Sequence, residues 1–277
     1  PVGGGNTKKQ ISLIKDFSSN FLHITPSYAL HVADVLESMK LKPSSLGLKG
    51  LVVGAEPHSE ATRKKLEEIY QAPVFNSFGL SEMNGPGVGF ECHLRQDIHI
   101  WEDNYLIEII DPVSLKPVEA GQVGELVLTH LNRLGMPLLR YRTKDLTFLY
   151  PEPCACGRTH QRIGRIMGRS DDMMIIKGIN VFPSQIEQVL MKIPEVGNNY
   201  QIVIDRGDDF LDRVTIKVEI VSKYFHGNLG ELKRIKNHIR RSLKDEMMIQ
   251  PEVDLLEPNT LPPSEGKAKR VVDLREI

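Results

Sequence analysis

The apolar positions in the first part of the chain follow two different periods. Across residues 26–39 they recur every three or four positions, as on one face of a helix, and residues 48–53 form a compact apolar run. A glycine turn, an amphipathic helical pattern over residues 58–71 and a second short apolar run at residues 73–75 follow. Strand, turn, helix and strand in this order predict a βαβ unit, and such units build parallel sheets.

Two polar stretches come directly after the two predicted strands. They are Gly54-Ala55-Glu56-Pro57 and Asn76-Ser77-Phe78-Gly79-Leu80-Ser81-Glu82. Because ligands of parallel sheets bind beyond the carboxyl ends of the strands, both stretches are candidates for a binding site. An aromatic ring beside a glycine suits a flat base, and the hydroxyl of Ser81 and carboxylate of Glu82 suit a phosphate oxygen and a divalent cation. Taken alone, Ser-Glu after a glycine also fits a capped helix start.

Alternating patterns over residues 99–111 and 124–131 predict antiparallel strands after the parallel layer. The polar stretch at residues 140–145 follows and ends in an acid. Asp145 suits the paired hydroxyls of a ribose or, in a simpler interpretation, a turn.

The segment Gly168-Arg169-Ser170-Asp171-Asp172 separates two kinds of pattern. It leads through an apolar run at residues 173–176 into Lys177-Gly178, and its glycines can adopt backbone angles that other residues resist. A surface turn followed by a strand and a hinge between two domains both fit this stretch. In the hinge interpretation, residues 1–168 form a nucleotide platform and residues 169–277 form a small lid.

The pattern after the hinge is that of a small α+β domain. The predicted elements are a helix at 183–192, strands at 200–205 and 213–221, a long basic helix at 229–248 and a strand at 252–256. The expected fold class is α/β, with mixed sheets and helices, plus a small C-terminal α+β lid of roughly a hundred residues. Near the end, Lys267 follows a glycine in a Pro-Pro loop, where it can reach across a cleft or lie solvated in a basic tail.

Composition indicates which binding partners and which cellular compartment are expected. The chain has 277 residues, is 40% hydrophobic and carries a formal net charge of −1, which argues against a whole-chain attraction to nucleic acid or to a membrane. No apolar run is long enough to span a bilayer. Three cysteines, an odd number, make no disulfide framework and indicate a reducing compartment, so we expect a cytoplasmic protein.

The cysteines themselves form a candidate metal site. Cys154 and Cys156 are separated by one residue, and Cys92, with His93 or His160, offers further ligands. In a reducing compartment a structural zinc explains clustered thiols better than a disulfide does. Inert thiols in a surface loop are the alternative.

Taken in order, these fragments resemble the adenylate-forming acyl-CoA ligase superfamily, and most closely its phenylacetate-coenzyme A ligases. The resemblance covers essentially the whole chain. It rests on residues 77–82 with Gly85-Pro86-Gly87, Ile100-Trp101-Glu102-Asp103, residues 168–172 continuing through 180–187, and Ser264-Glu265-Gly266-Lys267. It implies an enzyme that joins a small aromatic carboxylic acid such as phenylacetate to coenzyme A. ATP, Mg²⁺ and an acyl-adenylate intermediate are implied with it, and a homodimer by analogy alone.

The same resemblance implies which residues bind the nucleotide. Those expected along the adenine are Gly54, Ala55, Glu56, Pro57, Asn76, Ser77 and Gly79, with Phe78 stacked on the base. Asp145 and Arg169 are expected to hold the ribose.

The remaining implied roles concern the reaction itself. Ser81 is expected to hold the α-phosphate, Glu82 to bind Mg²⁺, and Lys267 to bridge the carboxylate and phosphate oxygens during adenylation. Asp171 matches the pivot on which the lid rotates for the thioester step. Gly178 is then expected to line the approach of coenzyme A.

Two departures from the family pattern shape the expectation for this chain. The loop that grips the β- and γ-phosphates would lie upstream of Pro1, so residues 1–168 would be the C-terminal part of the large AMP-binding domain. Lys144 stands where the family commonly has a glycine. We therefore expect the 277-residue chain alone to be inactive or feeble as a ligase. Two other classes stay open, namely a non-catalytic module that binds nucleotide or coenzyme A, and a zinc-stabilised interaction domain.

Overall fold

The predicted βαβ unit forms the parallel part of the first sheet. The computed structural model describes residues 6–176, 179–206, 212–225, 229–262 and 269–275. Three parallel strands pair side by side, namely β1 (Phe21–Ile24), β2 (Gly50–Val53) and β3 (Val74–Leu80). The helices of this part are α1 (Thr7–Asp16), α2 (Pro26–Ser38), η1 (Pro43–Leu46) and α3 (Glu60–Tyr70). Ser59 caps α3 by accepting a hydrogen bond from Thr62 N, as its residue type and position predict.

Helices α2 and α3 bury their apolar faces against these strands. The residues of this first core are Ala29, Leu30, Ala33, Leu48, Leu51, Val53, Leu66, Tyr70, Ala72 and Val74. Helix α1 is attached through Ile11, which packs against Val32 and Leu36 of α2. The helical spacing seen in the sequence is therefore the spacing of the buried face.

Strand β3 continues beyond its predicted end at residue 75. It runs to Leu80 because β4 (Gly85–Glu91) pairs with it in antiparallel fashion, from Ser77 opposite Phe90 to Leu80 opposite Gly85. A Cβ on Gly79 would lie 2.3 Å from the backbone oxygen of Gly85, so only glycine permits this approach. Two more antiparallel strands, β5 (Ile98–Ile100) and β9 (Arg162–Ile163), complete a sheet with the order β1-β2-β3-β4-β5-β9.

A second, antiparallel sheet stands beside the first. It contains β6 (Tyr105–Ile110), β7 (Gly124–His130), β8 (Tyr141–Thr147) and β10 (Gly168–Arg169), in the order β10-β8-β7-β6. The apolar residues between the sheets form a second core that includes Ile98, Ile100, Leu126, Leu128 and Ile163. Antiparallel strands after the parallel layer are thus confirmed. The pattern missed β8, because its residues are mostly polar and half-buried.

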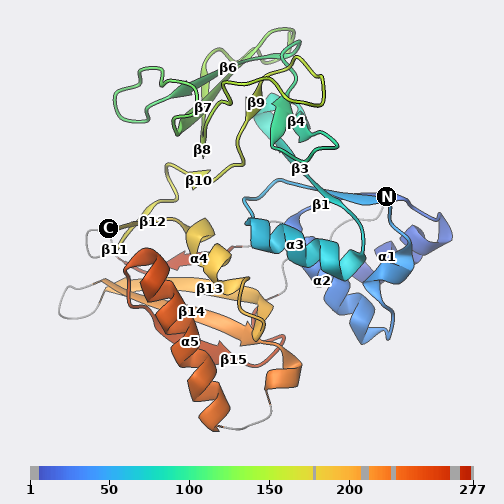
Figure 1. Ribbon diagram of the computed structural model, residues 1–277, viewed down its shortest axis with the longest axis vertical. Helices are drawn as coiled ribbons and strands as arrows, with labels where there is room; N and C mark the ends of the chain where they lie inside the picture. The colour runs from blue at the N-terminus through green and yellow to red at the C-terminus, as the bar shows by residue number, and fades with distance from the viewer. Residues whose placement is uncertain (1–5, 177–178, 207–211, 226–228, 263–268, 276–277) are drawn as a thin grey trace.

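The C-terminal part is the small α+β unit that the pattern predicts. Its elements are β11 (Met174–Ile176), β12 (Ile179–Val181), α4 (Pro183–Leu190), β13 (Val196–Arg206), β14 (Asp212–Ile220), η3 (Ser222–Tyr224), α5 (Leu229–Met247), β15 (Glu252–Leu256) and β16 (Val271–Asp273). The sheet order is β15-β14-β13-β16, and α4 and α5 lie on one face of it (Figure 1). The pattern missed β16, which is too short to show alternation.

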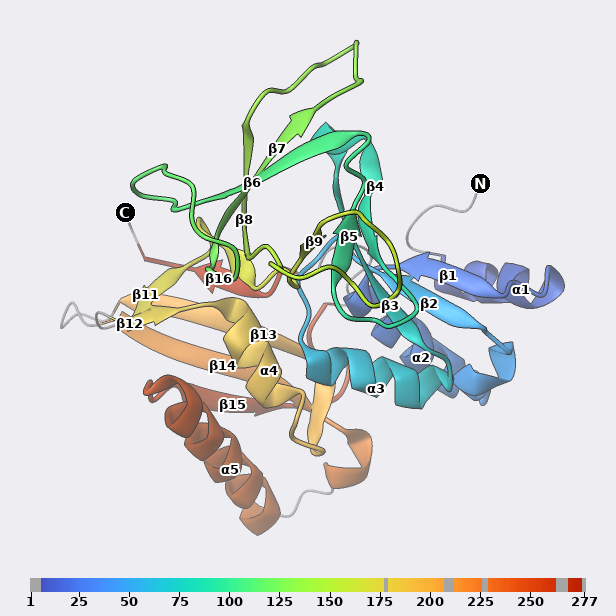
Figure 2. The ribbon, with the colours of Figure 1, turned by 45° about the horizontal axis from the view of Figure 1, so that its top comes forward.

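The C-terminal part meets the N-terminal part along helices rather than along sheet edges. Helix α3 packs against α4, and α2 packs against β13 (Figure 2). We call this contact the seam. The buried apolar residues of the C-terminal part form a third core, and none of the apolar clusters among the described residues has members on both sides of the seam. No helix in the described part of the chain is apolar and long enough to cross a membrane.

Candidate active site

A cleft of about 510 Å³ opens where β2 and β3 end and β8 passes beside them. Most residues predicted to bind the nucleotide line it. They are Ala55, Glu56, Pro57, Asn76, Ser77, Phe78, Gly79, Ser81, Glu82, Asp145 and Arg169. Segments that are distant in sequence therefore meet at the edge of the sheet where parallel strands usually place a ligand.

Four predicted residues stand apart from this set. Gly54 lines a different cavity, and a Cβ on it would come within 2.4 Å of Ser77 Oγ, so glycine lets β2 end against β3. Asp171 lines a neighbouring cavity instead. Gly178 and Lys267 lie outside the described residues.

Hydrogen bonds fix the wall on the β2 and β3 side. Ser77 Oγ donates to the backbone oxygen of Val53 at 3.2 Å, which ties the two strand ends together. Glu56 Oε1 accepts from Ser27 N at 2.7 Å, at the N-terminus of α2, where a carboxylate is favoured by the helix dipole. Groups of the chain itself therefore hold this wall in shape.

Arg169 connects the cleft to the predicted pivot. Its guanidinium makes two hydrogen bonds to the Asp171 carboxylate, at 2.8 and 2.9 Å, while its Nη1 is 3.8 Å from Asp145 Oδ1. The hydrogen bonds from Arg169 lower the pKa of Asp171. Burial raises the pKa of the neighbouring Asp172. The guanidinium expected to hold the ribose thus makes its closest contacts with the residue expected to be the pivot.

Lys144, the departure from the family pattern, keeps the backbone geometry that a glycine would give. Its φ is 69°, in the left-handed region that costs an ordinary residue about 1 kcal/mol or more. The backbone oxygen of Lys144 accepts from Ser170 N at 2.7 Å, which holds β8 against the segment leading to the pivot. Asp145 therefore faces the cleft despite the substitution.

Ser81 and Glu82 lie in a short turn, η2 (Ser81–Met83), at the end of β3. The backbone oxygen of Glu82 accepts a hydrogen bond from Arg133 Nη1, which anchors the turn. Burial, followed by the nearby Glu82 carboxylate, raises the pKa of Tyr141. A carboxylate that accepts from one phenol keeps other lone pairs for a cation, so the donor set fits Mg²⁺ at Glu82.

Sequence reasoning missed His58 and Arg165, which also line the cleft. His58 is 4% exposed, and its Nε2 has no hydrogen-bond partner among the described residues. Burial, and then the charge of Arg165, lowers the pKa of His58 to about 3. Arg165 Nη1 donates to the backbone oxygen of His58 at 3.2 Å and its Nη2 lies 2.7 Å from Glu60 Oε2. Neither residue belongs to a local motif, so no sequence signal marks them.

A second cavity of about 450 Å³ lies at the seam. Glu187 of α4 crosses it, because its Oε1 accepts from Thr62 Oγ1 at 2.6 Å and from Ser59 N at 3.1 Å at the start of α3. Its Oε2 accepts from Tyr200 within the C-terminal part at 3.2 Å. Asn198 Nδ2 donates to Asp34 Oδ1 at 2.8 Å, also across the seam.

The three predicted metal-ligating thiols converge at a separate place. Cys92, Cys154 and Cys156 lie together with His99 rather than with His93 or His160. His93 is exposed, and His160 contributes its backbone oxygen to His99.

Two sequence profiles of known families match the chain. Residues 4–132 match the AMP-binding enzyme profile, and residues 178–275 match that of the AMP-binding enzyme C-terminal domain. The chain is 45% identical to the phenylacetate-coenzyme A ligase of Thermus thermophilus, over 100% of the chain and 65% of that protein. It is 39% identical to that of Escherichia coli, over 100% of the chain and 63% of the relative. The chain thus spans less than two thirds of the length of these relatives.

A solved structure of 2-hydroxyisobutyryl-CoA ligase, in the postadenylation state with R3-HIB-AMP, superposes with a TM-score of 0.91 at 29% identity. The match covers 99% of this chain and 58% of that one. Fold, cleft and profiles agree, and the chain belongs to the AMP-binding enzymes. Within that family it is a homologue of the phenylacetate-coenzyme A ligases.

The same ligase has been solved in other arrangements, and these match less well. Its open structure gives a TM-score of 0.59 and its thioesterification structure 0.58, at the same 29% identity. Because these are structures of one and the same ligase, the difference in TM-score reflects how the parts of that ligase are arranged relative to each other. The two sides of the seam therefore sit in this chain as they do in the postadenylation structure.

Proposed function

We propose that this chain supplies the nucleotide cleft and the lid of a ligase that joins an aryl acid, such as phenylacetate, to coenzyme A. The reaction runs through an acyl-adenylate and releases pyrophosphate and then AMP. The observation that carries the proposal is the convergence of residues 55–57, 76–79, 81–82, 145 and 169 on one cleft. The homologous phenylacetate-coenzyme A ligases supply the class of substrate.

The chemistry of the first step fits the groups in the cleft. Adenylation increases the negative charge on oxygens bound to phosphorus, and fixed positive groups and donors lower that barrier. Glu82 would hold Mg²⁺, which supplies Lewis-acid stabilisation of those oxygens. Ser81 would donate to the α-phosphate, and Lys267 would bridge the carboxylate and phosphate. Phe78 lines the cleft but is only 7% exposed, so it offers the base a small part of its ring.

The second step requires the lid to move, and the proposed domain boundary allows this. Residues 1–168 and 169–277 are the two proposed domains, with Asp171 as the pivot. The hydrogen-bonded seam and the separate apolar cores support this division. Gly178 is proposed to line the approach of coenzyme A in the rotated arrangement.

The proposed location is the cytoplasm, and the proposed assembly is a homodimer. The three free thiols fit the reducing cytoplasm. A homodimer rests on the resemblance alone, and light scattering after size-exclusion chromatography measures it.

The test is ATP–pyrophosphate exchange across aromatic and aliphatic acids, run on the chain extended upstream, with AMP binding measured in parallel. Glu82→Gln and Ser81→Ala should lower exchange by about 10²–10³-fold, because each removes a group aimed at the developing charge. Glu119→Gln, an exposed acid remote from the cleft, is the matched control. Lys267→Ala should abolish exchange and spare thioester formation from preformed acyl-adenylate.

The assay also separates the competing class of function. If the 277-residue chain binds AMP but shows no exchange even when it is extended upstream to the length of its relatives, it is a non-catalytic nucleotide-binding module. We expect feeble exchange by the chain alone, and exchange at family-like rates by this chain would contradict that expectation.

A further inference from the structure

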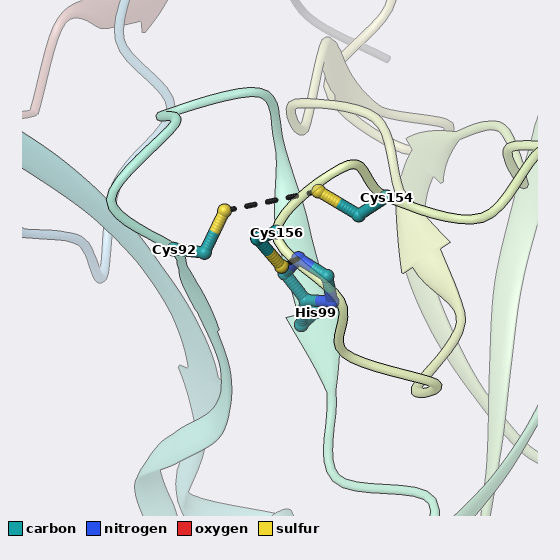
Figure 3. Close-up of side chains that lie close together, drawn as sticks. All are labelled: Cys92, His99, Cys154 and Cys156. Atoms are coloured by element: carbon teal, nitrogen blue, oxygen red, sulfur yellow. Dashed lines mark hydrogen bonds between the residues drawn. The ribbon is translucent and has the colours of Figure 1, made fainter.

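Four metal-ligating side chains meet outside the nucleotide cleft. The Sγ atoms of Cys92, Cys154 and Cys156 and a ring nitrogen of His99 all lie within 4.8 Å of one another (Figure 3). They come from three segments, namely the end of β4, strand β5, and the stretch between β8 and β9. None of the four lines the cleft.

Two of the distances between these atoms can be compared with the edges of a tetrahedral metal site, and all of them are within 4.8 Å. With zinc bonds of about 2.3 Å to sulfur and about 2.1 Å to nitrogen, a tetrahedron has edges of about 3.8 Å between sulfurs and about 3.6 Å between sulfur and nitrogen. The Sγ atoms of Cys92 and Cys154 are 3.9 Å apart, and Cys156 Sγ is 3.6 Å from His99 Nε2. The two measured edges therefore match both expected lengths.

The imidazole is oriented for this role by a backbone carbonyl. His99 Nδ1 lies 3.3 Å from the backbone oxygen of His160, to which it can donate its proton. That bond leaves the lone pair on Nε2, which faces the thiols (Figure 3). Metal-bound histidines commonly have such a partner on the other ring nitrogen.

The backbone around the cysteines is folded into tight turns that present the thiols together. Gly157 N donates to the backbone oxygen of Cys154 at 3.1 Å, with Gly157 at a φ of 84°. Arg95 N donates to the backbone oxygen of Cys92 at 2.9 Å. Inert packing would explain a buried thiol, but it explains neither a buried imidazole that is 1% exposed nor its aim at Cys156.

We propose that Cys92, His99, Cys154 and Cys156 bind one structural Zn²⁺. Three thiolates and one imidazole are a zinc ligand set, and four protein ligands leave no position open for a substrate. The fourth ligand is thus His99, and neither His93 nor His160 provides it. The proposal stands independently of the ligase activity.

The position of the site gives the metal a mechanical role. Residues 148–161, between β8 and β9, contain no helix or strand, and the metal would fasten them to β4 and β5. The chain then enters β9 and brings Arg165 and Ile166 to the nucleotide cleft. Zinc would therefore hold one wall of the cleft in place from behind.

Metal analysis of the chain purified under reducing conditions is the first test, and we expect about one zinc per chain. Cobalt substitution should give the visible bands of a tetrahedral thiolate site. Cys156→Ser should weaken zinc binding by at least about 100-fold in a chelator competition, because losing a direct ligand exceeds the effect of losing an outer partner. His93→Ala and His160→Ala are the matched controls and should keep the metal, since neither side chain is a ligand.

Hydrogen exchange tests the mechanical role on the unmutated protein. Removing zinc should speed amide exchange across residues 148–163 by at least about tenfold and leave α5 unchanged. No zinc in the reduced protein, or loss of zinc from His93→Ala with retention in Cys156→Ser, overturns the proposed site. Equal exchange with and without zinc overturns its role at the cleft wall.

Discussion

The interior of each half of the molecule and the seam between the halves are held by different interactions. Inside the N-terminal half, Leu66 is fully buried against the parallel strands, and inside the C-terminal half Ile239 of α5 is fully buried in the core of that half. Across the seam the contacts described above are polar, from Glu187 to Thr62 and from Asn198 to Asp34. Apolar burial is lost only at a large cost, whereas a hydrogen bond exchanges with water for a net of about 1 kcal/mol. We therefore expect the seam to be the part of the molecule that opens while each half stays folded.

The largest effect is expected from removing a buried apolar side chain inside one half. Leu66→Ala should lower the free energy of unfolding by about 2–5 kcal/mol, because it leaves a cavity under α3. Urea denaturation followed by circular dichroism measures it. Lys64→Ala, on the exposed side of the same helix, should change it by less than about 0.5 kcal/mol. A loss as small for Leu66→Ala as for Lys64→Ala would show that this core is not tightly packed.

A pH titration probes the buried imidazole that lines both the cleft and the seam cavity. The pKa of His58 is about 3 in the fold and 6.5 as its ordinary value, so below pH 6.5 the unfolded chain takes up a proton that the fold does not. Stability from this group is complete above pH 6.5 and falls by about 1.4 kcal/mol per pH unit as the pH drops toward 3.

The measurement for His58 is the difference between the unmutated protein and His58→Gln. Denaturation at pH 7.5 and pH 5 should show a stability loss in the unmutated protein that is about 2 kcal/mol larger than in the variant. Equal losses in the two proteins would mean that His58 is protonated in the fold.

Glu187→Ala should change the relative arrangement of the two halves more than it changes the free energy of unfolding. Removing the acceptor for Thr62 and Ser59 should shift the balance between arrangements by about tenfold, the equivalent of about 1.4 kcal/mol. Small-angle scattering should report a larger radius of gyration, and adenylation should fall while thioester formation is spared. Tyr200→Phe removes only the contact at the other oxygen, 3.2 Å away, and is the control. Unchanged scattering for Glu187→Ala would show that the hydrogen bonds of Glu187 do not hold the two sides of the seam together.

The smallest effect is expected from Asn198→Ala. Its amide donates to Asp34 at 2.8 Å, but its own Oδ1 is buried without a partner in the described part of the chain, and deleting that unsatisfied group offsets the loss. The same scattering and half-reaction assays should show a change worth less than about 0.5 kcal/mol. A shift as large as that of Glu187→Ala would mean that the seam is held at α2 rather than at α3.

The sequence predicted the elements whose hydrophobic pattern is regular. The C-terminal strands β13, β14 and β15 alternate cleanly because one face packs on α4 and α5. Strands β4 and β8 were missed, because β4 begins in Gly-Pro-Gly and β8 lines the cleft with polar residues. A strand that lines a binding site often lacks the alternation of apolar and polar residues by which strands are recognised in a sequence.

The candidate site was predictable where local motifs carry it and not where distant segments meet. Residues 54–57 and 76–82 follow predicted parallel strands, so the predicted topology alone places both stretches at the same edge of the sheet. His99 was counted as part of a strand, because nothing in its spacing from Cys154 reveals that the two side chains converge. His58 and Arg165 reach the cleft through tertiary contacts alone.

Arg169 lies at the proposed boundary between the two domains and has an acid near it on each side, namely Asp145 and Asp171. One guanidinium cannot make a bidentate pair with Asp171 and at the same time turn fully toward Asp145, from which it is now 3.8 Å away. An occupant of the cleft that recruits this side chain therefore loosens Asp171. Because coupled equilibria are reciprocal, a movement that takes Asp171 away from Arg169 raises the affinity of the cleft for that occupant by the same factor by which the occupant weakens the Arg169–Asp171 pair.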